Sequence, residues 1–239
     1  MIPIIAINSG ILSVFLLFSA IRTYSTHKRT KDKYIEYFFW FFLFLGITTV
    51  LGAMQGVIVS DLKWLDFMFD VYTFPGAIGL AFLVKLTLDL LDRKTLEKIS
   101  FFTIIILSFI LALIPALDWQ PAKVATQGPF IFWEDNRGPT INALTGVVLS
   151  LPVLWIVAFF IYKGIKSESR YVRIKAFLIS AGMLFFMLSG AVDLIVGADP
   201  NIFYVSSVSS VLSVLAIFIF QFALYYRFKK PFEALPLVK

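Results

Sequence analysis

The residues of this chain that could do chemistry are carboxylates and amides set inside long apolar stretches. Asp66 and Asp70 are four residues apart, so they lie on one face if this stretch is helical. A charge at the centre of a bilayer costs at least about 2.5–3.5 kcal/mol on insertion scales, so acidic residues in such stretches usually face the protein interior and serve a function. The candidate ligand- or ion-binding residues are Asp66, Asp70, Tyr72, Asp193, Asn8 and Gln55.

The chemistry that these candidates predict is the binding of a cation or an amine. They lie toward the predicted outer side of the apolar stretches. That side has eight acidic and three basic residues, and such an excess of negative charge attracts positive ligands. Two simpler interpretations stay open. Asp70 and Asp193 could form interior hydrogen bonds without any ligand. Asp66, Asp199 and the acids of the loops could be solvated.

The composition excludes several kinds of site. The chain has no cysteine and a single histidine, His27, so it lacks the residues for disulfides, thiolate metal sites, catalytic thiols and paired-histidine haem sites. A Ser-His-Asp triad within the membrane is excluded as well, because His27 falls in a basic loop. We therefore expect no metal, no cofactor and no enzymatic activity.

Other residues are expected to serve structure. Lys85 and Asp89 are one helical turn apart, a spacing that predicts a local ion pair. Small residues let membrane helices approach closely, because no hydrophobic force draws helices together in lipid. For the serines among them, a polar pathway is the alternative. The predicted packing positions are Gly52, Gly56, Ser206, Ser210 and Ser213.

Seven apolar stretches must position these residues. Each is long enough to cross a hydrocarbon core of roughly 30 Å, which takes about 20 residues of helix. Apolar residues make up 59% of the chain and charged residues 15%, against about 25% charged residues in a soluble domain. The predicted fold class is all-α, a polytopic membrane protein with one bundle over 1–230 and a short cytoplasmic tail over 231–239. The stretches cover 2–23, 36–59, 65–91, 99–117, 140–164, 172–197 and 202–227.

The basic residues predict an orientation. The chain has 21 Lys and Arg residues, and 18 of them lie on one side of the membrane. This is the side with the C-terminus and the loops that follow the first, third and fifth stretches. By the positive-inside rule the N-terminus lies outside and the C-terminus in the cytoplasm. We expect an integral protein of the cell membrane whose basic residues contact lipid headgroups. The net charge of +6 therefore does not indicate a nucleic-acid partner.

One loop of real size, 118–140, joins the fourth and fifth stretches on the outer side. Its prolines and glycines, Pro129 and Gly128 among them, argue against a regular helix. Its aromatic residues, which include Trp119 and Trp133, suit the membrane interface. The alternative is a lid over an outward-facing site.

This layout resembles the seven-span N-terminal sensor region of prokaryotic histidine kinases. The similarity covers the compact spans, the outer loop with Gly-Pro and Trp, and a sixth span that starts from a basic run at 170–175 and contains Gly182, Ser189 and Gly190. The resemblance implies a sensor. Because no dimerisation helix or kinase domain follows Arg227 in this sequence, it implies a module that works through a partner.

The chain lacks the sequence motifs of three other seven-span families. Residues 202–227 contain no lysine that could bind retinal. Lys94 follows Asp92-Arg93 where G-protein-coupled receptors have an aromatic residue. Val153 follows Pro152 where the sugar transporters built of three, one and three spans have glutamine.

These observations lead to a receptor-like or sensor-like membrane protein that works through other membrane or cytoplasmic proteins. Two alternatives remain. The first is an accessory subunit of a larger membrane complex. The second is a transporter of a small solute, which needs polar groups near the bilayer midplane.

Overall fold

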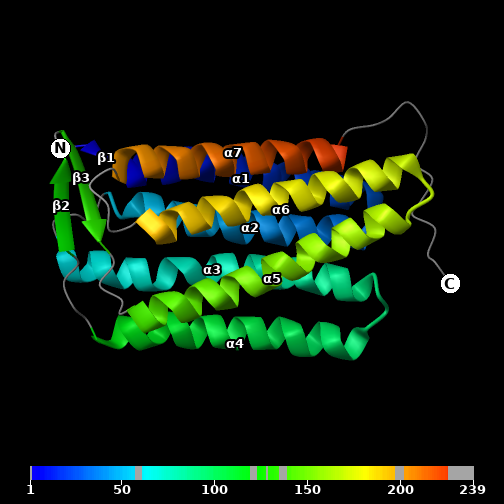
Figure 1. Ribbon diagram of the computed structural model, residues 1–239, viewed down its shortest axis with the longest axis horizontal. Helices are drawn as coiled ribbons and strands as arrows, with labels where there is room; N and C mark the ends of the chain where they lie inside the picture. The colour runs from blue at the N-terminus through cyan, green and yellow to red at the C-terminus, as the bar shows by residue number, and fades with distance from the viewer. Residues whose placement is uncertain are drawn as a thin grey trace.

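Seven long helices make up almost the whole molecule, as the apolar stretches predict. The computed structural model describes residues 2–56, 61–118, 123–127, 129–134, 139–196 and 202–225. All seven helices are long and apolar enough to cross a membrane, so the chain is an all-α, multi-pass membrane protein (Figure 1). The helices are α1 (Ile4–Thr30), α2 (Lys33–Met54), α3 (Leu62–Asp89), α4 (Lys94–Asp118), α5 (Pro139–Lys166), α6 (Arg170–Val196) and α7 (Ile202–Tyr225).

The turn between α1 and α2 illustrates why the helices end where they do. Lys31 adopts a left-handed conformation with φ 57°, and its N–H donates to the carbonyl of His27 at 2.7 Å. Asp32 then caps α2, because its carboxylate accepts from the N–H of Tyr34 at 2.8 Å. A left-handed residue that closes one helix and an acidic cap that opens the next allow a tight reversal.

Six of the helices form a ring. Around it, α1 packs against α2, α2 against α3, α3 against α5, α5 against α6, α6 against α7, and α7 against α1. Helix α4 lies outside this ring and packs against α3 and α5, at the lower edge of Figure 1. Helix α3 is therefore a central element that contacts α2, α4 and α5.

Aromatic side chains fill the middle of the ring. Phe41 and Phe42 of α2 and Phe220 of α7 are at most 1% exposed. The Phe220 ring meets the other two edge-on, with ring centroids 5.6 and 6.0 Å apart. Such pairs contribute about 0.5–1.5 kcal/mol beyond the area they bury. Ile156 of α5 and Met183 of α6 complete this core at 0% exposure.

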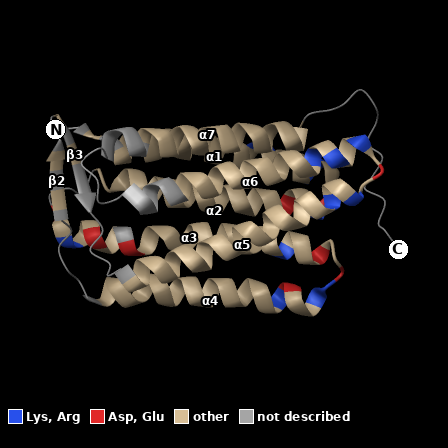
Figure 2. Cartoon of the chain, viewed as in Figure 1, with Lys and Arg blue, Asp and Glu red and all other residues tan. Residues whose placement is uncertain are grey.

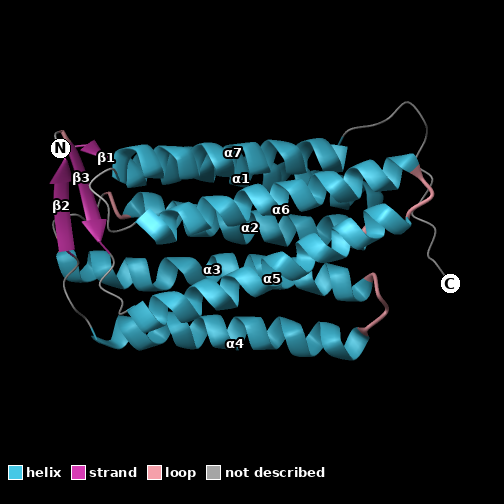
Figure 3. Ribbon diagram, in the orientation of Figure 1, coloured by secondary structure: helices cyan, strands magenta, loops and turns pink. Residues whose placement is uncertain are grey.

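A small three-stranded sheet, which the sequence patterns do not predict, caps one end of the bundle. Its strands are β1 (Ile2–Pro3), β2 (Lys123–Gln127) and β3 (Phe130–Glu134). Strand β3 lies in the middle, antiparallel to β2 and parallel to β1, as Figure 3 shows. The loop 118–140, expected only to be non-helical, thus contains a hairpin. The hairpin is joined by the chain's N-terminus, a pairing across more than a hundred residues that local patterns do not encode.

The two ends of the bundle differ in charge (Figure 2). We call the end with β1, β2 and β3 the sheet end, and the opposite end, with the α1–α2, α3–α4 and α5–α6 turns, the basic end. Apart from Lys63 and Lys123, the described Lys and Arg residues lie toward the basic end. The buried acids of α3 lie at the other end.

Candidate functional site

Two buried carboxylates mark the sheet end of α3. Asp66 is 5% exposed and Asp70 is 1% exposed. They occupy the first turns of α3, which begins after Asp61, whose carboxylate accepts from the N–H groups of Lys63 and Trp64. The alternative interpretation of Asp66 as a solvated residue is therefore wrong. The sequence places Asp66 near a helix end, and only the folded chain covers that end.

A small apolar cluster covers this region. Ala6 of α1 and Leu65 of α3 are its buried centre, and Tyr72 and Ile131 pack against them. Because Ile131 belongs to β3, the sheet contributes one side chain to this cluster. The candidate residue Tyr72 thus lies in the same cluster as Leu65, the immediate neighbour of Asp66.

Helices α1 and α2 approach closely beside this cluster. A Cβ at Gly52 would lie 2.9 Å from Ser9 Oγ, and a Cβ at Gly56 would lie 2.6 Å from Ala6 Cβ. Glycine at these two positions therefore permits the close packing that brings α2 against the first turns of α1. Gln55, between these glycines, is 1% exposed. Asn8 of α1 is partly buried.

For Asp193 and Ser206, the structure describes the helix in which each residue lies but not its side chain. Asp193 lies in the last turn of α6, at the sheet end, and Ser206 lies in the second turn of α7. Their helices belong to the described structure, but both side chains fall outside it, as does Asp199. The assignment of Asp193 to the candidate binding site therefore stays a prediction.

Serines join α6 to α7. The Ser189 hydroxyl lies 3.0 Å from the backbone carbonyl and 3.0 Å from the hydroxyl of Ser209, and 2.7 Å from the hydroxyl of Ser213. All three side chains are buried. Of the predicted stripe, Ser213 thus lies in the α6–α7 contact, and Ser210 is partly buried. Ser209 is a contact residue that was not predicted, although its spacing of four from Ser213 is a usable signal.

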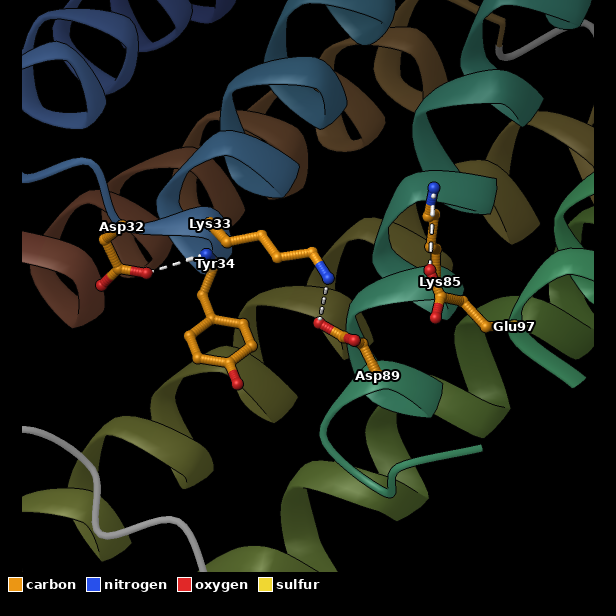
Figure 4. A network of polar contacts seen from close by, with 6 residues as sticks. All are labelled: Asp32, Lys33, Tyr34, Lys85, Asp89 and Glu97. Carbon is orange, nitrogen blue, oxygen red and sulfur yellow. Dashed lines mark hydrogen bonds and ion pairs between the residues drawn. The ribbon is translucent and has the colours of Figure 1, made fainter. Parts of the chain in front are cut away.

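The predicted pair between Lys85 and Asp89 is not formed (Figure 4). Lys33 Nζ of α2 lies 2.9 Å from Asp89 Oδ2, and Lys85 Nζ lies 3.7 Å from Glu97 Oε1 of α4. Because α3 is flanked by α2 and α4, each charge finds a partner on a neighbouring helix. Both lysines also lie near the buried ring of Tyr37, at 5.6 and 5.9 Å from its centroid.

Hydroxyl groups also meet between α3, α4 and α5. Thr73, Ser108 and Thr145 line a cavity of about 10 Å³, roughly the room that one water molecule needs. The hydroxyl oxygens of Ser108 and Thr145 are buried and make no hydrogen bond within the described part of the chain. A space of this size does not accommodate a transported solute.

The chemistry that these sites can do is recognition of charge. Covered carboxylates attract a cation more strongly than carboxylates in water, because the effective dielectric constant is lower. Among the described residues, no group of three or more His, Asp or Glu side chains is arranged to hold a metal ion. No protein-family model matches the chain, and no curated protein matches it in sequence.

Proposed function

We propose that this protein is a non-enzymatic, receptor-like or sensor-like membrane module that binds a cation or an amine at the sheet end. The observation that carries the proposal is the burial of Asp66 and Asp70, at 5% and 1% exposure, one helical turn apart at the sheet end of α3. Two carboxylates on the same face of one helix attract a positive charge, and the attraction is stronger where the effective dielectric constant is lower than that of water.

The position of α3 supports a signalling role for this site. One helix carries the two acids at the sheet end and, at the basic end, Lys85 and Asp89, which contact α4 and α2. A shift of α3 on ligand binding would therefore act on the contacts that join three helices at the far end. In the proposed orientation the sheet end is outside and the basic end faces a cytoplasmic partner at the cell membrane. The layout resemblance to the sensor region of histidine kinases points the same way.

Replacement of the two acids tests the proposal. Thermal unfolding of the purified protein is measured with and without calcium, choline and spermidine as probes, for the wild type and for the Asp66→Asn/Asp70→Asn variant. We expect at least one probe to raise the unfolding temperature of the wild type and to lose this effect in the double variant. Asp92→Asn is the matched control, because Asp92 is exposed and its left-handed φ of 54° is well tolerated by asparagine. An equal shift in the wild type and the double variant would refute the assignment.

The second candidate function is an accessory subunit of a membrane complex, and α4 is the observation in its favour. This helix lies outside the ring, and large apolar side chains such as Phe102, Ile106 and Leu117 are more than half exposed. Such a surface can contact a partner helix as well as lipid. Extraction in a mild detergent followed by size analysis tests this role. A monomer without co-purifying protein would count against it.

A further inference from the structure

A groove runs along the basic end of α1, next to the end of α7. Its volume is about 550 Å³, and apart from Tyr225 of α7 its lining comes from α1. The α1 residues are Phe18, Ile21, Arg22, Ser25, Thr26 and Arg29. Their spacing of three and four places them on one face of the helix. The groove is thus a continuous stripe of α1 that changes from apolar to basic toward the end of the helix.

The basic part of the groove is organised around Arg22. Its guanidinium carbon lies 3.9 Å from the centroid of the Tyr225 ring, and one of its nitrogens donates to Gln221 Oε1 at 3.4 Å. The guanidinium has five N–H donors, so these contacts orient it and leave donors for a ligand. Arg29 is exposed on the same face, two helical turns nearer the end of α1.

Ser25 and Thr26 already use their hydroxyl groups as donors within α1, so Arg22 and Arg29 are the groups in the groove that can bind a negatively charged ligand. The hydroxyls of Ser25 and Thr26 donate to the carbonyls of Ile21 and Arg22, at 2.9 and 3.0 Å. No acidic side chain is among the described residues that line the groove. The groove differs in this respect from the contacts between α2, α3 and α4, where Lys33 pairs with Asp89 and Lys85 pairs with Glu97. The groove therefore presents positive charge that no acid in its lining neutralises.

The apolar part of the groove lies deeper along α1, toward the middle of the bundle. Phe18 is 62% exposed and Ile21 is 66% exposed. In a membrane-spanning helix such side chains face the acyl chains of lipids. An amphiphile with a negative head and a hydrocarbon tail matches the groove in both its chemistry and its order along the helix. Guanidinium groups suit phosphate because their donors are planar and paired.

We propose that this groove binds an anionic phospholipid. Arg22 and Arg29 hold the phosphate-containing headgroup, and Phe18 and Ile21 contact an acyl chain. Basic pockets between membrane helices bind anionic headgroups in this way. The inference depends on the membrane-spanning character of α1 and α7, and it is independent of the ligand proposed for Asp66 and Asp70.

Native mass spectrometry of the full chain tests the site. The protein in detergent is titrated with phosphatidylglycerol and, separately, with phosphatidylcholine. We expect bound phosphatidylglycerol at concentrations at which phosphatidylcholine does not bind. The Arg22→Gln/Arg29→Gln variant should lose affinity for phosphatidylglycerol by about tenfold or more. Equal binding of the two lipids by the wild type would overturn the proposal, as would full occupancy by inorganic phosphate alone.

Two further variants separate the groove from general surface charge and from misfolding. Arg93→Gln/Lys94→Gln removes the same charge from exposed positions at the same end and should retain the wild-type affinity. Arg22→Lys/Arg29→Lys keeps the charge but lacks the paired donors, so it should fold and bind phosphatidylglycerol more weakly than the wild type. An equal loss in the Arg93/Lys94 variant, or no loss in either arginine variant, would contradict a specific site.

Discussion

Lys33 Nζ at the start of α2 lies 2.9 Å from Asp89 Oδ2 in the last turn of α3. The Asp89 side chain is 14% exposed, whereas the Lys33 side chain is 57% exposed, so a flexible lysine reaches a largely covered carboxylate. The pair joins α2 to the helix that carries Asp66 and Asp70 at its other end. It is thus a contact between helices at the end of the molecule opposite the proposed ligand site.

Removing Lys33 is expected to destabilise the bundle. Lys33→Met leaves the covered Asp89 carboxylate without its cation, which should cost roughly 1–2 kcal/mol, between the value of an exposed pair and that of a buried pair. Thermal unfolding in detergent measures the loss. The Lys33→Met/Asp89→Asn double variant should be less destabilised than the sum of the two single variants. Additive effects would mean that the two side chains do not interact.

Gly56 is expected not to tolerate even alanine. The new Cβ would lie 2.6 Å from Ala6 Cβ, so the turn after α2 and the start of α1 must move apart, at a cost of about 1–3 kcal/mol for overpacking. Gly10→Ala is the control, because its Cβ would lie 3.8 Å from Ala53 Cβ, an ordinary contact. We expect a lower unfolding temperature for Gly56→Ala alone. Equal behaviour of the two variants would show that close packing at Gly56 is not needed.

Two buried serines should respond differently to replacement by alanine. Ser189→Ala removes a hydroxyl that contacts Ser209 and Ser213, and hydrogen bonds between membrane helices contribute about 0.6 kcal/mol on average. Ser108→Ala removes a buried hydroxyl that makes no hydrogen bond within the described residues, so it should cost less. Chemical or thermal unfolding of both variants gives the comparison. A larger loss for Ser108→Ala would indicate that its hydroxyl has a partner.

The orientation of the chain can be tested on intact cells. The protein has no cysteine, and Thr126 of β2 and Thr30 of α1 are both exposed, at opposite ends of the bundle. We expect Thr126→Cys to react with a membrane-impermeant thiol reagent on intact cells, and Thr30→Cys to react only after the membrane is opened, because basic segments stay in the cytoplasm. The reverse pattern would place Asp66 and Asp70 on the cytoplasmic side.

The helices could be predicted from the sequence because the hydrocarbon core of a membrane offers no hydrogen-bond partners to the backbone. A chain in lipid must satisfy its N–H and C=O groups internally, so long apolar stretches become helices whatever their neighbours are. Several helix ends differ from the predicted ends of the stretches. The predicted first stretch ends at residue 23, whereas α1 continues to Thr30. The predicted second stretch runs to residue 59, whereas α2 ends at Met54. The predicted third stretch starts at residue 65, whereas α3 already starts after its cap at Asp61. Caps depend on single polar side chains.

By itself, the sequence determined that the chain is a bundle of seven membrane helices. It also determined that most basic residues lie at one end of this bundle and that α3 has acidic residues within its apolar stretch. Only the tertiary structure decided which side chains meet. Asp89 pairs with Lys33 rather than with Lys85, and Ile2 pairs with Phe130 of the hairpin. These contacts join segments far apart in the chain. They depend on which helices are neighbours and how each is rotated, and local spacing contains neither quantity.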